Sequence, residues 1–235
     1  MKVLVVGASG ATGRLVVDQL LSRGVEVNAI VRSPDALPDN PDLHKIQASV
    51  HDVTSSEMAV HLKGCSAVVS CLGHTLTFRG VFGKPRLLVT DTLQCMCQAI
   101  KSNAAERTVK VILMNTTGNS NRDIPEKPPL SQRLVIAILR LLLPPHVDNE
   151  NAADFLRTRI GQNDRAIEWV AVRPDALTDA QEVTKYDVHA SPIRNAIFDS
   201  AATSRINVAN FMVELISNET SWLKWKGQMP VVYNH

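Results

Sequence analysis

Apolar residues along the chain are grouped in short runs that alternate with longer amphipathic segments. A short run rich in β-branched residues predicts a strand buried on both faces, and an amphipathic segment predicts a helix. We therefore expect an α/β fold, a doubly wound parallel sheet of the Rossmann type, in a single domain that spans residues 1–235. The runs predict strands at 2–6, 25–31, 43–49, 66–71, 109–114 and 167–172, with a short last strand at 230–233.

One segment, at about residues 119–148, interrupts this alternation. It is polar and rich in proline at first, and then becomes an apolar helix at 130–143 that ends at Pro144 and Pro145. We predict a helical insertion here, after the fifth strand and on the substrate side. A helix that is apolar nearly all round must be covered, so we expect it to pack against the body of the protein, a partner subunit or a hydrophobic ligand pocket. Other helices are expected after residue 13 and at 55–62, 85–105, 148–160 and 207–217.

Three glycines lie between the first strand and the first helix, in the sequence Gly-Ala-Ser-Gly-Ala-Thr-Gly at residues 7–13. A tight turn at this place brings the backbone close to a dinucleotide pyrophosphate, which then meets the free N–H groups of the helix N-terminus. The strand before the glycines and the helix after them match this arrangement. We therefore predict a dinucleotide site, with a plain strand-to-helix turn as the alternative.

Arg32 follows the second strand, where NAD-binding sheets carry an acidic residue that holds the ribose 2′-hydroxyl. A guanidinium group cannot accept hydrogen bonds from those hydroxyls, but it pairs well with a 2′-phosphate. Ser33 can add a hydrogen bond to the same phosphate. The sequence therefore favours NADP(H) over NAD(H), unless Arg32 is only a solvated surface residue.

Polar residues and glycines also follow the other predicted strands. Asp52 can accept a hydrogen bond from the adenine amino group; alternatively it caps the helix at 55–62, a task that Thr54 or Ser55 performs equally well. Gly73 lets the backbone lie close to a dinucleotide. Ligands of doubly wound sheets bind at the carboxyl ends of the strands. We therefore expect one site to unite Arg32 and Asp52 with the segments 7–13, 71–73, 115–117 and 173–174.

Composition and charge narrow the classes of function. Hydrophobic residues make up 45% of the chain and charged residues 20%, as in an ordinary soluble globular protein. A formal net charge of +2 without a block of like charges argues against nucleic acid as a partner. The most apolar window, 134–143, is short and contains Arg140, so we predict no membrane span. No basic segment precedes the strand at 2–6, so it is not a signal peptide, and we expect a cytoplasmic protein.

The four cysteines indicate neither a disulfide framework nor a metal site. Cys95 and Cys97 lie two residues apart on a predicted helix, so their side chains point to different faces. Cys65 and Cys71 flank the fourth predicted strand. Buried, reduced thiols are the expected state, and we predict no metal ligands.

Several segments of the chain together resemble a known family. They are the glycine turn, Arg32-Ser33, Asp52-Val53, Leu72-Gly73 and the segments 167–174 and 204–212. They are similar to the atypical short-chain dehydrogenase/reductase group, in particular to NAD(P)H-binding proteins like biliverdin reductase B and flavin reductase. A looser resemblance links them to the NmrA-like proteins. The similarity extends over nearly the whole chain, and its motifs are specific for fold and cofactor rather than for substrate.

The resemblance implies a cofactor contact for each matching residue. Arg32 and Ser33 would hold the 2′-phosphate, and Asp52 and Val53 would contact the adenine. Thr116 lies where the biliverdin reductase B-like proteins have a serine near the nicotinamide, and Pro174 lies where the chain passes that ring; their neighbours Asn115 and Arg173 are included in the predicted site. The pyrophosphate would bind at Gly7, Ser9, Gly10, Ala11, Thr12 and Gly13, and the ribose and nicotinamide at Cys71, Leu72 and Gly73.

The sequence departs from the classical enzymes of this group in its catalytic residues. The classical enzymes use the motif Tyr-x-x-x-Lys, in which the lysine lowers the pKa of the tyrosine. Neither Tyr186 nor Tyr233 is followed by a lysine four residues later. We therefore favour an NADPH-dependent oxidoreductase that transfers hydride to a flat conjugated acceptor, such as a flavin or a quinone, because this reaction mainly needs stacking and exclusion of water.

Two other functions are alternatives to this reductase. The first is a non-catalytic NADP(H) redox sensor of the NmrA-like type, and the second is an epimerase or dehydrogenase of the extended group, which would need the Tyr-Lys pair. If the protein is an enzyme, Thr116 would orient the nicotinamide or the acceptor, unless it only forms a turn. His74 would supply a proton, unless it is a surface loop histidine. The expected partner is a small-molecule acceptor, and the protein is expected to be a monomer or a homodimer.

Overall fold

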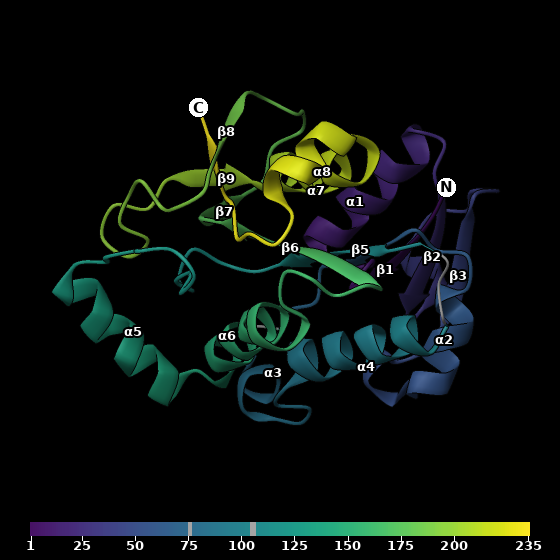
Figure 1. Cartoon of the computed structure of the whole chain (residues 1–235), viewed down its shortest axis with the longest axis horizontal. Helices are drawn as coiled ribbons and strands as arrows, with labels where there is room; N and C mark the ends of the chain where they lie inside the picture. Colours follow the sequence, from purple (N-terminus) through teal and green to yellow (C-terminus); the bar gives the residue numbers. More distant parts are fainter. Residues whose placement is uncertain (75–76, 104–106) are drawn as a thin grey trace.

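A computed structural model describes residues 1–74, 77–103 and 107–235, and within them an eight-stranded sheet forms the centre of the molecule (Figure 1). The strand order is β3-β2-β1-β4-β5-β6-β10-β8, and all neighbours are parallel except β8 and β10. This confirms the predicted Rossmann fold, because the order reverses between β1 and β4. The strands are β1 (Lys2–Val6), β2 (Glu26–Val31), β3 (Leu43–Gln47), β4 (Ala67–Ser70), β5 (Val109–Met114), β6 (Ile167–Pro174), β8 (Tyr186–His189) and β10 (Val231–Asn234).

Helices cover both faces of this sheet, as Figure 1 shows. Side chains alternate between the two faces along each strand. In β1, Val3 and Val5 therefore join one buried apolar cluster, while Leu4 and Val6 join the other. The first cluster includes α1 (Ala11–Ser22), α7 (Arg205–Ser217) and α8 (Glu219–Trp225), and the second includes α2 (Ser55–Leu62), α4 (Leu88–Ser102) and α6 (Pro144–Phe155).

The smaller elements lie at the rim of the sheet and in its connections. Helix α6 begins four residues before the predicted start at 148, because a proline can occupy the first turn of a helix. The helix predicted at 85–105 begins at Leu88 and is preceded by a short helix, α3 (Phe78–Phe82). The other small elements are η1 (Pro34–Ala36), η2 (Val50–Asp52), the π-helical turn η3 (Leu156–Ile160) and the parallel pair β7 (Ala176–Thr178) and β9 (Ala202–Ser204).

The apolar helix of the insertion is α5 (Leu130–Leu142), and most of it is exposed. Among its side chains, Gln132 and Ile136 are buried, whereas Leu134 is 64% exposed and Leu141 is 84% exposed. Of the three expected ways of covering this helix, packing against the body of the protein is therefore wrong for most of its length; a partner subunit or a ligand pocket stays a prediction. Within the described residues, none of the helices alone is long and apolar enough to cross a membrane; α5 reaches that length only together with α6 and η3, across a bend of 106°.

An ion pair attaches α5 to the body. The Arg140 guanidinium donates two hydrogen bonds of 2.8 Å to the Glu150 carboxylate on α6. Burial alone would raise the pKa of Glu150, but its interactions with His146 and Arg140 outweigh burial and lower that pKa to about 2. The carboxylate therefore stays charged across the ordinary pH range and holds α5 against α6.

A fully buried arginine attaches the start of the insertion to the sheet. Arg173 of β6 donates to both carboxylate oxygens of Glu126, at 2.7 and 3.1 Å. The same guanidinium also donates to the backbone carbonyls of Asn119, Met229 and Ala190. These bonds use all five donors of an arginine. The Arg173 side chain therefore has no donor left for a cofactor, and the predicted contact at this residue stays a prediction for its backbone.

Replacing Glu126 tests this arrangement. The change Glu126→Gln leaves the buried guanidinium without its counter-charge, so we expect the free energy of unfolding to fall by about 3–5 kcal/mol. Urea denaturation followed by circular dichroism measures it. The matched control is Glu182→Gln, which changes an exposed glutamate and should stay within about 0.5 kcal/mol of wild type. A loss below about 1 kcal/mol for Glu126→Gln would show that the pair contributes little.

Candidate functional site

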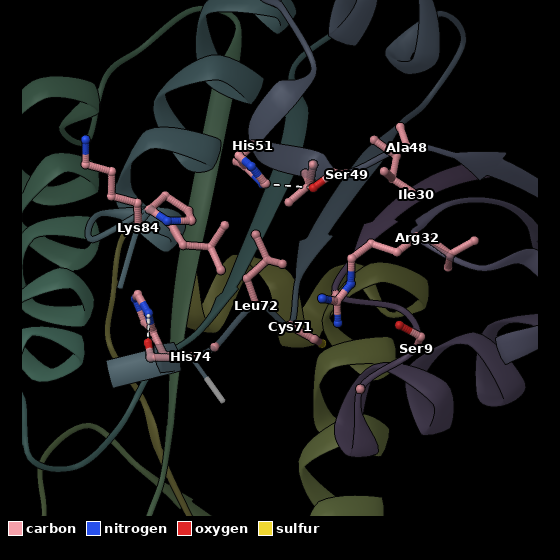
Figure 2. A pocket seen from close by; sticks show the side chains of 18 of the residues that line it. Ser9, Ile30, Arg32, Ala48, Ser49, His51, Cys71, Leu72, His74 and Lys84 are labelled. Carbon is pink, nitrogen blue, oxygen red and sulfur yellow. Dashed lines mark hydrogen bonds between the residues drawn. The ribbon is translucent and has the colours of Figure 1, made fainter. Parts of the chain in front are cut away.

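A cavity of about 480 Å³ opens at the carboxyl ends of β1, β2, β3 and β4 (Figure 2). This is the edge at which the sequence predicts the dinucleotide site. Arg32 and Lys84 bring positive charge to its lining, and none of the described residues that line it is an aspartate or a glutamate. The lining consists of Gly7, Ser9, Gly10, Ile30, Val31, Arg32, Ala48, Ser49, Val50, His51, Cys71, Leu72, Gly73, His74, Thr77, Gly80, Lys84, Pro85 and Leu88.

The glycine turn contributes the central part of the cavity lining, between the residues that follow β2 and those that follow β4. Gly7 has a φ of +73°, and a Cβ atom there would lie 2.6 Å from the carbonyl carbon of Cys71. A Cβ atom on Gly13 would overlap the carbonyl oxygen of Gly7. The turn thus brings β1, α1 and the end of β4 into direct backbone contact, which side chains at these two positions would prevent.

The N-terminus of α1 faces the cavity and is suited to an anion. Gly10 is the N-cap residue, in an extended conformation, and among the described residues no side chain caps the first turn. The backbone N–H groups at the start of the helix are therefore available to a phosphate group. Gly7, Ser9 and Gly10 line the cavity, while Ala11, Thr12 and Gly13 form the first turn behind them. The glycine segment fits a pyrophosphate.

Arg32 lies at the edge of the cavity where β2 ends. Its side chain is exposed, and Figure 2 shows the guanidinium group turned toward Ser9 and the glycine turn. This is a suitable place for a cation that meets a phosphate on the ribose. Ser33 is the N-cap residue of η1 and is not among the residues that line the cavity.

The two residues predicted to contact the adenine, Asp52 and Val53, lie beside the cavity lining, and their contact with a cofactor stays a prediction. The segment 48–51 lines the cavity after β3, whereas Asp52 and Val53 do not. Asp52 points to solvent, and its carboxylate lies 3.1 Å from Nε2 of His51; Val53 packs into the apolar cluster below the sheet. The 3₁₀ turn η2 causes this difference, because it directs Val50 and His51 toward the cavity and Asp52 away from it.

Asp52 does not have the alternative role of a helix cap. Thr54 caps α2: its hydroxyl accepts from the Glu57 N–H, and the Glu57 carboxylate accepts from the Thr54 N–H at 2.9 Å. This reciprocal pair is a capping box. This confirms Thr54, one of the two residues that the sequence offers as a cap in place of Asp52.

Beyond the glycine turn, the end of β4 continues the wall of the cavity. Cys71, Leu72 and Gly73 line it as the resemblance implies. Burial raises the pKa of Cys71 to about 12, so its thiol is neutral and carries no reactive thiolate at ordinary pH. Sequence reasoning missed five lining residues from the next segment: Thr77, Gly80, Lys84, Pro85 and Leu88. Gly80 and Gly83 were the available signal for a loop near a ligand.

His74 is neither a surface histidine nor a free proton donor. Its side chain is 5% exposed, its Nδ1 donates to the Gly80 carbonyl at 3.1 Å, and its Nε2 lies 2.8 Å from Oδ2 of Asp148. Both ring nitrogens therefore have protein partners. The ring closes one end of the cavity and joins the segment after β4 to α6, so we now assign His74 a positioning role.

Asp148 is the centre of this contact. It is fully buried, and its two carboxylate oxygens accept the backbone N–H groups of Val89 and Thr90 at 2.8 and 2.9 Å. These N–H groups belong to the first turn of α4, where a negative charge is favourable. The Thr90 hydroxyl donates in turn to the Asp148 carbonyl at 2.9 Å. One carboxylate thus joins α4, α6 and His74.

The residues predicted at the end of β5 form a turn beside the cavity rather than its lining. The Asn115 side chain accepts from the Thr116 N–H at 2.8 Å and donates to the Asn149 carbonyl at 2.9 Å. The Thr116 hydroxyl accepts from the Gly118 N–H at 3.2 Å, and the Pro174 carbonyl accepts from the Thr117 N–H. A contact of Asn115, Thr116 or Pro174 with a cofactor stays a prediction.

A profile of the NAD(P)H-binding family matches residues 7–219. The chain therefore belongs to this family, whose members bind a nicotinamide dinucleotide. No curated protein matches the chain significantly in sequence.

Solved structures are similar over the whole chain. One is an oxidoreductase from Lactococcus lactis, with a TM-score of 0.71 and 20% identity, covering 100% of this chain and 91% of that one. A candidate NADH-flavin reductase from Streptococcus pneumoniae has a TM-score of 0.68 and 19% identity, with 100% of both chains covered. An anaerobillin reductase from Escherichia coli has a TM-score of 0.68 and 14% identity, covering 100% and 97%. At these identities the likeness concerns the fold.

The role of Asp148 can be tested by an isosteric change. In Asp148→Asn, an NH₂ group replaces one acceptor oxygen and faces a backbone N–H of α4, so we expect the free energy of unfolding to fall by about 1–3 kcal/mol. Denaturant unfolding measures this value, and Asp42→Asn, at an exposed aspartate, serves as the control. If both variants unfold like wild type, the buried carboxylate does not hold α4 and α6 together.

Proposed function

We propose that the protein is an NADPH-dependent reductase that transfers hydride to a flat, conjugated acceptor such as a flavin or a quinone. The observation that carries this proposal is one continuous cavity that begins at Arg32, passes the N-terminus of α1 and ends at Lys84, Pro85 and Leu88. A dinucleotide bound at the first two features leaves the third for an acceptor. Two of the structurally similar proteins are described as reductases, which supports the same class of reaction.

The chain itself contributes binding and orientation. Arg32 would pair with the 2′-phosphate, and the uncapped start of α1 would hold the pyrophosphate. Leu72, Pro85 and Leu88 offer apolar surface at the other end, where they would exclude water from stacked rings. When bound, NADPH supplies a hydride to the acceptor and is oxidised to NADP⁺, and a proton from solvent completes the reduced acceptor.

No acid of the Tyr-Lys type is needed for such an acceptor. Tyr186 lies far along the chain on β8, and burial raises its pKa to about 12. Its hydroxyl donates to the Asn210 side chain at 2.9 Å. His74 and Cys71, which do line the cavity, are respectively fully hydrogen-bonded and held in the neutral thiol form. These assignments favour a proton from water.

The preference for NADPH is tested at Arg32. We expect Arg32→Ala to weaken NADPH binding about tenfold or more and to leave NADH binding nearly unchanged, because a charge-assisted phosphate contact contributes about 1.5–3 kcal/mol. Fluorescence titration with both cofactors measures it. Arg165→Ala is the matched control, since Arg165 is an exposed arginine just before β6, at the opposite edge of the sheet. Equal losses for both cofactors would contradict a role in 2′-phosphate recognition.

Turnover is tested by oxidation of NADPH and NADH with purified protein. We expect oxidation with FMN or a small quinone, faster with NADPH than with NADH, and none above background without an acceptor. Absorbance at the reduced nicotinamide band follows the reaction, and cofactor binding is measured in the same samples. Binding of NADPH without oxidation by any of these acceptors would overturn the reductase and favour the NADP(H) sensor instead.

A further inference from the structure

The exposed side of α5 is a continuous apolar face. Leu130, Leu134, Ile138 and Leu141 recur at intervals of three and four residues, which places them on one side of the helix. All four are exposed, from 46% for Ile138 to 84% for Leu141. Single exposed leucines are ordinary on a protein surface, but a row of them along one helix marks an interaction site.

Positive charge borders this face. The sequence from Lys127 to Val147 contains Lys127, Arg133 and Arg140 and no acidic residue. At about 100° per residue, Arg133 and Arg140 lie on one border of the leucine row, between the exposed face and the side that meets α6. Arg140 is committed to Glu150, whereas Lys127 and Arg133 are exposed and have no ion-pair partner among the described residues.

The shape of the segment suits a flat partner rather than a groove. Figure 1 shows α5 at the edge of the molecule, away from the sheet and beside α6. Its 13 residues extend about 20 Å. Prolines at 128 and 129 precede the helix, and prolines at 144 and 145 follow it, so both of its ends are sharply bounded. An apolar face with cations at its border is typical of helices that lie in the interface of an anionic bilayer.

We propose that α5 binds the surface of an anionic membrane, with its leucine row in the headgroup region and Lys127 and Arg133 on acidic headgroups. A second copy of the chain is a weaker occupant, because a symmetric pair of α5 helices would bring two sets of these cations together. The proposal does not depend on the reaction that the cavity catalyses. It assigns a partner to a helix whose apolar face the body leaves open.

Sedimentation with lipid vesicles tests the proposal on the full chain. We expect the protein to sediment with vesicles of phosphatidylcholine and phosphatidylglycerol, and much less with phosphatidylcholine alone. The double variant Leu134→Gln/Leu141→Gln should bind at least about tenfold more weakly, since burial of one leucine contributes about that factor. The change Arg133→Glu should reduce binding to the anionic vesicles about fivefold or more.

The matched control removes two exposed apolar side chains from other helices. Val60→Gln/Leu223→Gln changes α2 and α8, and we expect it to bind vesicles like wild type. NADPH titration and unfolding curves confirm that all variants are folded. The proposal is overturned if wild type stays in the supernatant with both lipids, or if the leucine variant sediments like wild type. It is also overturned if sedimentation equilibrium finds a dimer that the leucine variant dissociates, because α5 is then a contact between copies of this chain.

Discussion

The turn from β1 into α1 depends on two residues that have no side chain. Gly13 lies against the carbonyl of Gly7, and Gly7 lies against the backbone of Cys71 and Leu72. These contacts set the distance between the first strand, the first helix and the end of β4. A methyl group at either position would overlap backbone atoms, which cannot move aside as a flexible side chain can. The cavity lies at the carboxyl ends of the strands, where the glycine turn passes so close to the end of β4.

The rest of the site follows from that geometry. With α1 drawn onto the sheet, its N-terminal N–H groups face the space between β1 and β4, where the strand order reverses. The ends of β2 and β3 then supply one wall of the cavity, and the end of β4 with the segment to α4 supplies the other. The lining carries positive charge because the acidic residues near the cavity face solvent or are buried against other groups. Asp52 faces solvent, and Asp148 is occupied by two N–H groups of α4.

The sequence predicts those features that depend on neighbouring residues. The main parallel strands, the bounds of α2 and the glycine turn could all be predicted, since each depends on a local pattern. Cys71, Leu72 and Gly73 also lie where expected, because a strand end has only one edge of the sheet to occupy. The alternation could not predict three short strands: the parallel pair β7 and β9, and β8, which is antiparallel to the last strand of the chain.

The errors concern side chains whose partners are distant in sequence. Arg173 meets Glu126 and His74 meets Asp148, and both partners belong to the region between β5 and β6 that breaks the alternation. Their separations, 47 and 74 residues, leave no periodic signal along the chain. Asp52 and Val53 lie outside the cavity lining for a different reason. A single 3₁₀ turn, η2, shifts the cavity lining by a few residues, which is within the usual uncertainty of element boundaries.

Helix α6 connects the cavity with the exposed helix. Asp148 and Glu150 are two residues apart, so their side chains leave α6 in nearly opposite directions. Asp148 binds the start of α4 and the His74 ring at one end of the cavity, and Glu150 binds Arg140 of α5. The packing of α6 against the sheet therefore fixes the site and the position of the apolar face at the same time. An apolar row on a free loop would lose conformational entropy on meeting any surface, whereas a helix held in this way is already ordered before it binds.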